Sequence, residues 1–423
     1  MTSFDRSHDL FERAERVIPL GTQTLSKHPS QWVQGAHPRY LVRGRGAHVW
    51  DVDGNEYVDF PMALGPVLLG YAEPVVDDAV RRQLDDGITF TLMHPLEVEV
   101  AERIVALCPG VDAVRFGKSG SDAVSAAVRA ARAITGRDRV LVAGYHGWHD
   151  WYIASTTRDA GVPKAVVDLT ATFTFGDLAS LERALETYPD EVAAVVLEPS
   201  GATVPEPGYL EAVVDLTRRH GAVSVFDEVI TGFRLAPGGA RERYGVQPDL
   251  SCYGKALGNG MPISAVGGRA AVMAVFKEVF YSGTHGGEAL SLAAAGAVLD
   301  AIADGEVLGH IERLGSDLQQ GLRALVDEHG VAHLVTVGGE PHRTVVGFPG
   351  PDELVHKSWV QQCLGQAGVL FNGSLFPCFR HTEDDVALAL DAFDGALGAL
   401  GRGEDVAARL VGPPVEPVFR PVR

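Results

Sequence analysis

Lysine is scarce in this chain: it supplies only six of the 423 residues, against thirty arginines. Positive charge as a whole is outnumbered, because 36 basic side chains stand against 55 acidic ones and give a formal net charge of −19. Such an excess of negative charge disfavours nucleic acid or an anionic membrane surface as a partner. The scarcity also means that a lysine inside a glycine-rich loop is rarely there by chance.

Cysteine is rare as well, and its four copies are scattered along the chain, at Cys108, Cys252, Cys363 and Cys378. None of them forms a CxxC pair, so the sequence predicts neither a disulfide framework nor a zinc site. The N-terminus is polar and no apolar run reaches membrane length, which predicts a soluble, cytoplasmic protein. No GxGxxG motif follows the first predicted strand, and this absence disfavours a flavin or nicotinamide enzyme.

Short apolar runs alternate with helical segments between about residues 112 and 270, a pattern typical of a parallel α/β sheet. The predicted strands cover residues 113–116, 140–143, 194–197, 223–226, 250–253 and 265–267. The flanking regions are of mixed α+β character, so we expect a large central domain and a smaller one built from both chain ends. The expected boundaries are 1–65 for the N-terminal part of the small domain, 66–308 for the large domain and 309–423 for the C-terminal part.

The flanking regions carry their own predictions. A β-meander is expected over residues 39–60, with helices at 74–84, 96–107, 290–303, 306–328 and 352–364, and strands at 333–335, 344–346 and 369–371. A final amphipathic helix is predicted from residue 383 to about 400. Thr382 is its expected N-cap, because three acidic residues follow it.

One predicted strand delivers an acid and the next delivers a lysine. Residues 222–226 end at Asp227-Glu228, and residues 250–253 end at Gly254-Lys255, which opens a glycine-rich turn. Ligands of open α/β sheets bind outside the carboxyl ends of the strands. An acid and a lysine at that edge suit pyridoxal 5'-phosphate (PLP): Lys255 would form the Schiff base and carry a proton, and Asp227 would pair with the pyridinium nitrogen. The alternative for Lys255, a surface loop, fits the tightly specified turn less well.

Two further glycine-rich segments are candidates for binding a phosphate. Residues 115–123 combine a strand, a Gly/Ser turn and a helix start, where Ser119 or Ser121 can cap the helix and free backbone N–H groups can hold an anion. An ordinary helix cap explains the same pattern equally well. Residues 281–288 offer Thr284 as another phosphate donor, although in isolation this segment is only a flexible loop.

Two other strand ends carry aromatic and acidic residues. Tyr145 can stack on a flat ring, and a structural use of the neighbouring His146 and His149 is favoured over metal ligation because their spacing matches no standard site. Glu198 can support the ring-oxygen side of a cofactor or the substrate amine, or it can simply satisfy a loop. Arg234 is equally consistent with binding a substrate carboxylate and with a structural role.

Together these motifs resemble those of the class III (ω-type) aminotransferases, which are PLP-dependent enzymes of fold type I. The resemblance runs from residues 44–59 to residues 381–385 and is greatest to the branch that contains glutamate-1-semialdehyde 2,1-aminomutase and the aminotransferases of sugar and natural-product pathways. It implies an α/β fold with a mostly parallel seven-stranded sheet sandwiched by helices, a smaller α+β domain, and a homodimer with shared active sites.

The resemblance also implies roles for individual residues. Lys255 would carry the cofactor, Asp227 would bind its pyridine nitrogen, and the other contacts would come from Val229 and Tyr145 on the two ring faces, Gly120 and Ser121 at the phosphate, Thr284 at the neighbouring subunit's phosphate, and Glu198 near the ring oxygen. Two segments depart from the family pattern. Lys118 stands where an asparagine is common, and the residues after Thr284 end in Gly-Gly-Glu288 in place of Gly-Asn-Pro.

The function expected from this resemblance is transfer of an amine in two half-reactions, from a donor such as glutamate to a carbonyl acceptor. An oxidised aminosugar or aminoglycoside carbon is the expected acceptor, and polar residues 21–24, 26–34 and Asn372 either line its pocket or form solvated loops. The same cofactor machinery serves an aminomutase or an epimerase, which differ in how long gating loops retain an intermediate. A binding protein that has lost its chemistry is the remaining alternative, against which the Asp227 and Lys255 pair argues.

Overall fold

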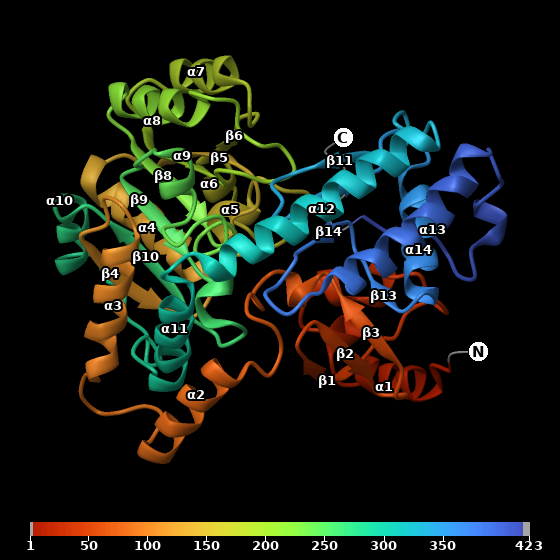
Figure 1. Cartoon of the computed structure of the whole chain (residues 1–423). Coiled ribbons are helices and arrows are strands. Elements are labelled where there is room, and N and C mark those ends of the chain that lie inside the picture. Colours follow the sequence, from red (N-terminus) through yellow and green to blue (C-terminus); the bar gives the residue numbers. More distant parts are fainter. Residues whose placement is uncertain (1–2, 418–423) are drawn as a thin grey trace. The chain divides into compact units, whose positions relative to one another are not determined.

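A computed structural model describes residues 3–417 of the chain (Figure 1). Contacts between Cα atoms group these residues into two compact units. The first unit contains residues 3–64, 69–73 and 309–417, and the second contains residues 65–68 and 74–308. No helix in residues 3–417 is both long and apolar enough to cross a bilayer.

A seven-stranded sheet forms the centre of the second unit, with the strand order β4-β10-β9-β8-β7-β5-β6. Its strands are β4 (Ala113–Gly117), β5 (Arg139–Ala143), β6 (Thr170–Thr172), β7 (Val192–Leu197), β8 (Val223–Glu228), β9 (Leu250–Tyr253) and β10 (Ser264–Gly268). Only β10 runs antiparallel to its neighbours. The predicted, mostly parallel seven-stranded sheet is therefore confirmed. Strand β6 was absent from the prediction because Thr-Ala-Thr contains no apolar run.

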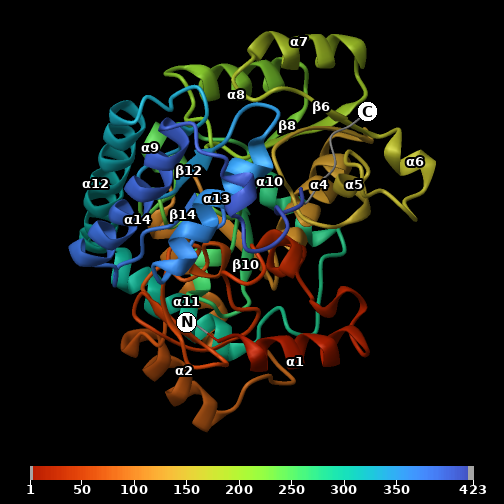
Figure 2. The ribbon, with the colours of Figure 1, turned by 90° about the vertical axis from the view of Figure 1, so that its right-hand side faces the viewer.

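Helices cover both faces of this sheet, and the side chains of β7 show how. Ala194 and Val196 point toward α4 (Gly120–Thr135), whereas Val195 and Leu197 point toward α7 (Leu178–Thr187) and α8 (Tyr209–Arg219). Figure 2 shows α7 and α8 side by side over their face of the sheet. Burial on both faces explains why the strand reads as one continuous apolar run.

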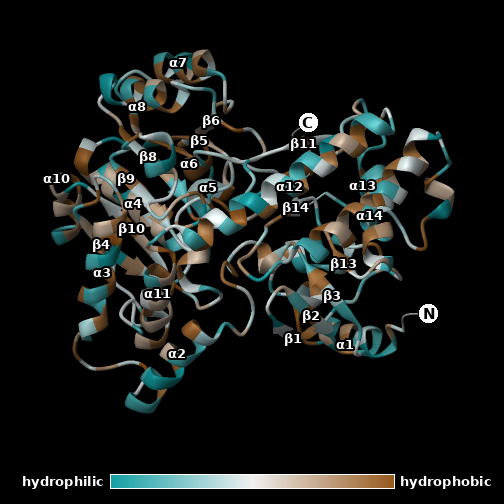
Figure 3. Ribbon diagram, in the orientation of Figure 1, coloured by the Kyte–Doolittle hydropathy of each residue, from teal (hydrophilic) through white to brown (hydrophobic). Residues whose placement is uncertain are grey.

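The remaining helices of the second unit are α2 (Pro74–Asp86), α3 (Pro95–Leu107), α5 (Asp150–Ile153), α6 (Lys164–Val167), α9 (Ala240–Tyr244), α10 (Ala270–Met273) and α11 (Ala289–Ile302). Helix α11 packs against α2 and α3. It is apolar around most of its circumference, and Figure 3 colours it largely brown. A helix that is hydrophobic on all sides belongs in an interior, which is where α11 lies.

The first unit combines two small sheets with long helices. One sheet has the order β1-β2-β3-β13 and the other β11-β12-β14. Their strands are β1 (Leu41–Arg45), β2 (His48–Asp51), β3 (Glu56–Asp59), β11 (Thr336–Gly338), β12 (Thr344–Gly347), β13 (Val369–Leu370) and β14 (Ser374–Leu375). The helices are α1 (Asp5–Glu15), α12 (Glu306–Glu328, in this unit from residue 309), α13 (Glu353–Gln366) and α14 (Glu383–Gly401).

Local chemistry explains where two of these elements begin. Thr382 caps α14 as predicted, and its side chain accepts a hydrogen bond from the Asp385 N–H at 3.2 Å. The strand predicted at residues 333–335 is wrong, because β11 begins only at Thr336. The N–H groups of Leu334 and Val335 instead donate to the Val331 carbonyl, at 2.8 and 3.0 Å, and this turn delays the strand.

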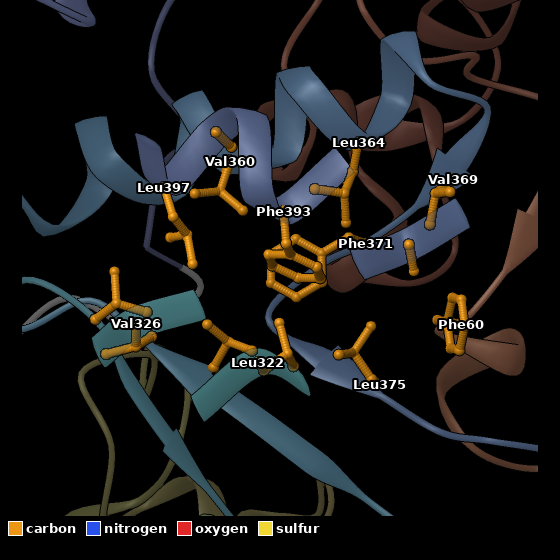
Figure 4. Close-up of a cluster of buried hydrophobic side chains, with 14 of the residues drawn as sticks. Phe60, Leu322, Val326, Val360, Leu364, Val369, Phe371, Leu375, Phe393 and Leu397 are labelled. Atoms are coloured by element: carbon orange, nitrogen blue, oxygen red, sulfur yellow. The ribbon is translucent and has the colours of Figure 1, made fainter. Parts of the chain in front are cut away.

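The core of the first unit is a large hydrophobic cluster between α12, α13, α14 and the small strands (Figure 4). Phe371 and Phe393 lie at its centre with their ring centroids 5.3 Å apart and their planes at 79°. Leu322 and Leu364 pack around this edge-to-face pair. The geometry is the one that aromatic quadrupoles favour, so the pair adds specificity to simple burial.

Candidate active site

Asp227 lies at the carboxyl end of β8, is 4% exposed and is held on both carboxylate oxygens. Its Oδ1 accepts a hydrogen bond from the Val229 N–H at 3.1 Å. Its Oδ2 lies 2.8 Å from Nδ1 of His146, whose Nε2 faces the Ala143 carbonyl at 3.2 Å. Because the carbonyl requires a proton on Nε2, a further proton must lie between Nδ1 and Oδ2. The pair therefore fixes the orientation of Asp227 and is suited to hold a proton on an adjacent ring nitrogen.

The partnership between His146 and Asp227 was not predicted from the sequence. The expected structural use of the histidine gave no partner, and the two residues are 81 positions apart in the chain. The only available signal was that His146 follows β5 and Asp227 ends β8, two strands whose carboxyl ends lie at the same edge of the sheet. No group of three or more His, Cys, Asp or Glu side chains in residues 3–417 is arranged to hold a metal ion.

Val229 joins three strand ends into one wall. A Cβ added to Gly120 would lie 2.8 Å from both methyl groups of Val229, and a Cβ on Gly254 would lie 3.5 Å from one of them. The first contact leaves no room for any side chain at position 120. Glycine is therefore required where the start of α4 approaches the end of β8, and Val229 presents an apolar surface beside Asp227.

Lys255 follows directly after Gly254 at the end of β9. It begins a 3₁₀ helix, Lys255–Gly258, and has a positive φ of 43°, unusual for a residue with a side chain. Such a conformation costs roughly 1–3 kcal/mol and persists only where the surrounding structure enforces it. The left-handed Asn259 closes the same turn. The predicted tight turn thus exists, and it fixes the backbone from which the lysine projects.

The phosphate turn predicted before α4 is a capping box. Ser119 is the N-cap and accepts from the Asp122 N–H, while Oδ2 of Asp122 accepts from the N–H groups of Lys118 and Ser119 at 3.1 and 2.8 Å. These bonds leave the N–H groups of Gly120 and Ser121 without a partner among the described residues. Both belong to the first turn of a sixteen-residue helix, so they and the helix dipole form an anion site.

Both departures from the family pattern meet in a single bond. Nζ of Lys118 lies 2.8 Å from Oε2 of Glu288, which caps α11 by accepting from Leu290 and Ser291. Burial opposes ionisation of Glu288, but the hydrogen bonds from Lys118 and Ser291 and the charge of Lys118 outweigh it and lower its pKa. The lysine at the phosphate turn and the glutamate after Thr284 therefore compensate each other, and they connect the turn to the 281–288 loop.

Tyr145 and Glu198 lie together at the ends of β5 and β7. The Tyr145 N–H donates to Oε1 of Glu198 at 2.9 Å. The tyrosine side chain is 51% exposed, and burial of its inner part together with the charge of Asp227 raises its pKa. A half-exposed ring beside the Asp227 carboxylate is placed to cover one face of a bound aromatic ring.

The remaining predicted residues fall into separate environments. The Ser121 hydroxyl accepts from the Trp148 N–H at 3.3 Å, so the loop after β5 rests on the phosphate turn. Thr284 is exposed, and no contact in this chain brings it to the other predicted residues. Arg234 is 1% exposed and donates to the Gly65 carbonyl at 3.0 Å, which favours the structural role over substrate binding.

A cavity of about 360 Å³ lies within the first unit. Gly21, Thr22, Ser26 and Gln34 from the polar segments line it, whereas Asn372 does not. Aromatic side chains contribute much of the remaining wall, namely Phe11, Trp32, Tyr40 and Tyr71. The polar segments are thus partly pocket-lining and not merely solvated, although their wall is more aromatic than the sequence suggested.

The assembled residues fit PLP. Gly120 and Ser121 offer free N–H groups for a phosphate, Val229 and Tyr145 supply two surfaces for a ring, and Asp227 faces the position of a ring nitrogen. When bound, the cofactor supplies an electron-accepting ring to a carbanion at the substrate's α-carbon. Asp227 with His146 keeps the nitrogen proton in place, and Lys255 carries the proton at the α-carbon.

Comparison with known proteins agrees with this fit. The family described as aminotransferase class-III matches residues 31–396. The chain is 40% identical to the glutamate-1-semialdehyde 2,1-aminomutase of Sorangium cellulosum (strain So ce56), over 93% of this chain and 96% of the relative. It is 34% identical to the 3-aminobutyryl-CoA aminotransferase of Cloacimonas acidaminovorans (strain Evry), with the same coverage of both proteins.

The fold agrees with solved structures as well. The chain matches the PLP internal aldimine form of the FumI protein of Sphingopyxis sp. MTA144 with a TM-score of 0.88 and 31% identity, covering 97% of this chain and 99% of the other. Fold, cofactor site and sequence similarity thus lead to the same assignment. The chain belongs to the class III aminotransferase family and is a PLP-dependent enzyme.

Proposed function

We propose that this enzyme moves an amino group from a donor amine, such as glutamate, to an aldehyde or ketone acceptor in two half-reactions. The observation that carries the proposal is the pairing of strand ends at the site. Lys255 projects from a strained turn after β9, and the neighbouring strand β8 ends at Asp227, which His146 holds in place. A proton-holding acid and a positioned lysine are what exchange of an amine at an α-carbon requires.

The acceptor that we propose is an oxidised carbon of an aminosugar or aminoglycoside, in the biosynthesis of an antibiotic or another secondary metabolite. Its support is the resemblance of the motifs to the branch that includes aminotransferases of sugar and natural-product pathways. Polar groups on residues 21–34, several of which line a cavity in the first unit, are consistent with a hydroxylated substrate.

The test is a screen of acceptors against the pyridoxamine form of the enzyme. A donor amine first converts the bound cofactor, excess donor is removed, and single carbonyl compounds are then added. Return of the original visible spectrum identifies an acceptor. We expect aldehydes of the aminosugar class to restore it, and the variant Lys255→Ala to restore none.

A second candidate is an intramolecular aminomutase, and the names of several relatives favour it. Relatives at 34–40% identity include glutamate-1-semialdehyde 2,1-aminomutases. If glutamate 1-semialdehyde alone restored the spectrum and gave only 5-aminolevulinate, the aminotransferase proposal would be wrong. An epimerase would instead invert a single substrate and show no requirement for a second carbonyl compound.

We also propose a cytoplasmic homodimer in which Thr284 reaches the phosphate of the neighbouring subunit. The segment around residues 88–98 supports this assembly, because it exposes Ile88, Phe90, Leu92, Met93 and Val98, by between 44% and 85%. Consecutive exposed apolar side chains of this kind mark surfaces that a partner covers. The domain boundaries 1–65, 66–308 and 309–423 belong to the same proposal.

A further inference from the structure

Two hydroxyl groups are buried beneath the phosphate turn without any hydrogen-bond partner. Oγ of Ser264 and the hydroxyl of Tyr281 are both inaccessible to solvent, and neither has a partner among the described residues. Ser264 as a whole is 0% exposed. A buried hydroxyl without a partner costs roughly 1–3 kcal/mol, so two of them in one place require an explanation.

Both hydroxyls converge on Gly117, the last residue before the turn. Ser264 opens β10 and pairs directly with Gly117 across the sheet. A Cβ added to Gly117 would lie 2.9 Å from Oγ of Ser264 and would collide with the hydroxyl of Tyr281. Glycine at position 117 therefore leaves the space in which these two groups face each other.

The same two groups lie close to the cofactor site. A Cβ on Gly254, the residue before Lys255, would lie 3.8 Å from Cβ of Ser264 and 3.5 Å from Val229. Ser264 thus stands between the residue that precedes the lysine and the residue that precedes the phosphate turn. Other contacts hold Tyr281: its carbonyl accepts from Nη2 of Arg115 at 2.7 Å, and its ring lies 6.1 Å from that of Phe276. Its hydroxyl is placed there by the fold and not by a bond of its own.

We propose that Ser264 and Tyr281 form a second set of donors for the cofactor phosphate, behind the turn, and bind it directly or through one buried water molecule. Gly120 and Ser121 supply backbone N–H groups from α4, and the two hydroxyls supply side-chain donors from β10 and from the 281–288 loop. The anion satisfies both hydroxyls at once, which explains why the protein alone leaves them unpaired. This role concerns the cofactor and is independent of which carbonyl compound is the acceptor.

The nearest competing acceptor is Asp122. Its Cβ would lie 3.2 Å from a Cβ on Gly117, and its charge, after burial, is the main cause that raises the pKa of Tyr281. However, Oδ2 of Asp122 already accepts two backbone N–H groups of the turn. Lys118, the cation of the turn, is held by Glu288. Neither of these charged groups therefore accounts for the serine hydroxyl.

The proposal is tested by comparing PLP with pyridoxal, which has the same ring and aldehyde but no phosphate. Dissociation constants of both compounds are measured for the apoenzyme and for its variants Ser264→Ala and Tyr281→Phe. A hydrogen bond to a charged group contributes about 1.5–3 kcal/mol, so each variant is expected to bind PLP about tenfold or more weakly. Pyridoxal affinity is expected to stay unchanged, because that ligand never reaches these donors.

Thermal unfolding of the apoenzyme separates this role from a structural one. Removing a hydroxyl that is buried and unpaired in the apoenzyme leaves its stability unchanged or raises it. Tyr209→Phe and Thr217→Val, which remove buried hydroxyls on α8, are controls that leave both dissociation constants unchanged. Unchanged PLP affinity in both variants would overturn the proposal. Equal weakening of PLP and pyridoxal, or a loss of apoenzyme stability that indicates a bond to Asp122, would overturn it as well.

Discussion

The interiors of the two units differ in what they bury. Around Phe393 in the first unit the core cluster is made of hydrocarbon side chains (Figure 4). Beside β8 in the second unit the interior also contains charged groups, and Glu228, Arg234 and Arg241 are each at most 1% exposed. Hydrocarbon burial is favourable by itself, whereas a buried charge is tolerated only with partners.

Those partners form a continuous network behind the active site. The Ser251 hydroxyl donates to Glu228 at 3.2 Å and accepts from Nη1 of Arg241 at 3.2 Å. Arg241 also donates to the carbonyls of Pro109 and Gly110, at 3.0 and 3.1 Å. Glu228 immediately follows Asp227, so this network anchors the strand end that presents the catalytic acid. The comparison shows stability supplied by undirected packing in one unit and orientation supplied by directed bonds in the other.

The largest effect is expected from Asp227→Asn in the second unit. The amide keeps the shape of the carboxylate but removes its charge, so the proton on the cofactor nitrogen is no longer held. We expect the rate of the half-reaction with a donor amine to fall by about 100-fold to 10,000-fold, as for loss of a positioned acid–base or electrostatic group. Stopped-flow spectra of the cofactor measure this rate.

Asp300→Asn is the matched control, because the Asp300 side chain is 62% exposed on α11. Thermal unfolding of both variants checks that the fold is intact. A rate for Asp227→Asn close to that of the control would show that buried charge at β8 serves stability and not catalysis, and the comparison between the units would then collapse.

Phe393→Ala tests the hydrocarbon side of the comparison. The change removes a fully buried ring and its edge-to-face contact with Phe371, which leaves a cavity in the first unit. Such substitutions cost about 3–5 kcal/mol of unfolding free energy. Urea unfolding followed by circular dichroism measures the loss, and the native baseline is expected to retain the visible spectrum of the bound cofactor.

Val17→Ala provides the control in the same unit, since Val17 is 78% exposed. It is expected to change the unfolding free energy by less than about 0.5 kcal/mol. If Phe393→Ala changed stability as little as this control, the cluster in Figure 4 would not be the source of that unit's stability.

What the sequence predicted correctly was local in origin. Strands such as β7 and β8 are buried on both faces, so each reads as an uninterrupted apolar run that ends where the chemistry begins. Asp227 and Lys255 were recognised because each follows such a run directly. Strand β6 was missed because it is short and polar, and β11 was misplaced because a turn precedes it.

The pairings were beyond the sequence because they join residues remote in the chain. His146 meets Asp227 across 81 positions, and Lys118 meets Glu288 across 170. No local pattern encodes such a distance; it follows only from the order of the strands in the sheet. Lys118 and Glu288 had each been noted as unusual, yet only the fold shows that they are unusual together.

Glu228→Gln is expected to have the smallest effect, and its sign depends on pH. Burial raises the pKa of Glu228 to about 7, against the opposing effects of the Ala240 N–H, the charge of Arg241 and the Ser251 and Thr231 hydroxyls. Between pH 4.5 and 7 the unfolded chain therefore loses a proton that the folded chain keeps. Fewer protons are bound by the unfolded state, so the unfolding free energy of the natural enzyme falls as pH rises through this window, by at most about 3 kcal/mol.

Glutamine resembles the protonated carboxyl group and does not titrate. The variant should therefore match the natural enzyme near pH 5 and exceed its stability near pH 8, as urea unfolding at the two values would show. Glu278→Gln, at an exposed position, should leave the pH profile unchanged. The opposite result, a variant that is less stable near pH 8, would mean that Glu228 is needed as the ionised partner of Arg241. Charge, and not only hydrogen bonding, would then hold the strand end that carries Asp227.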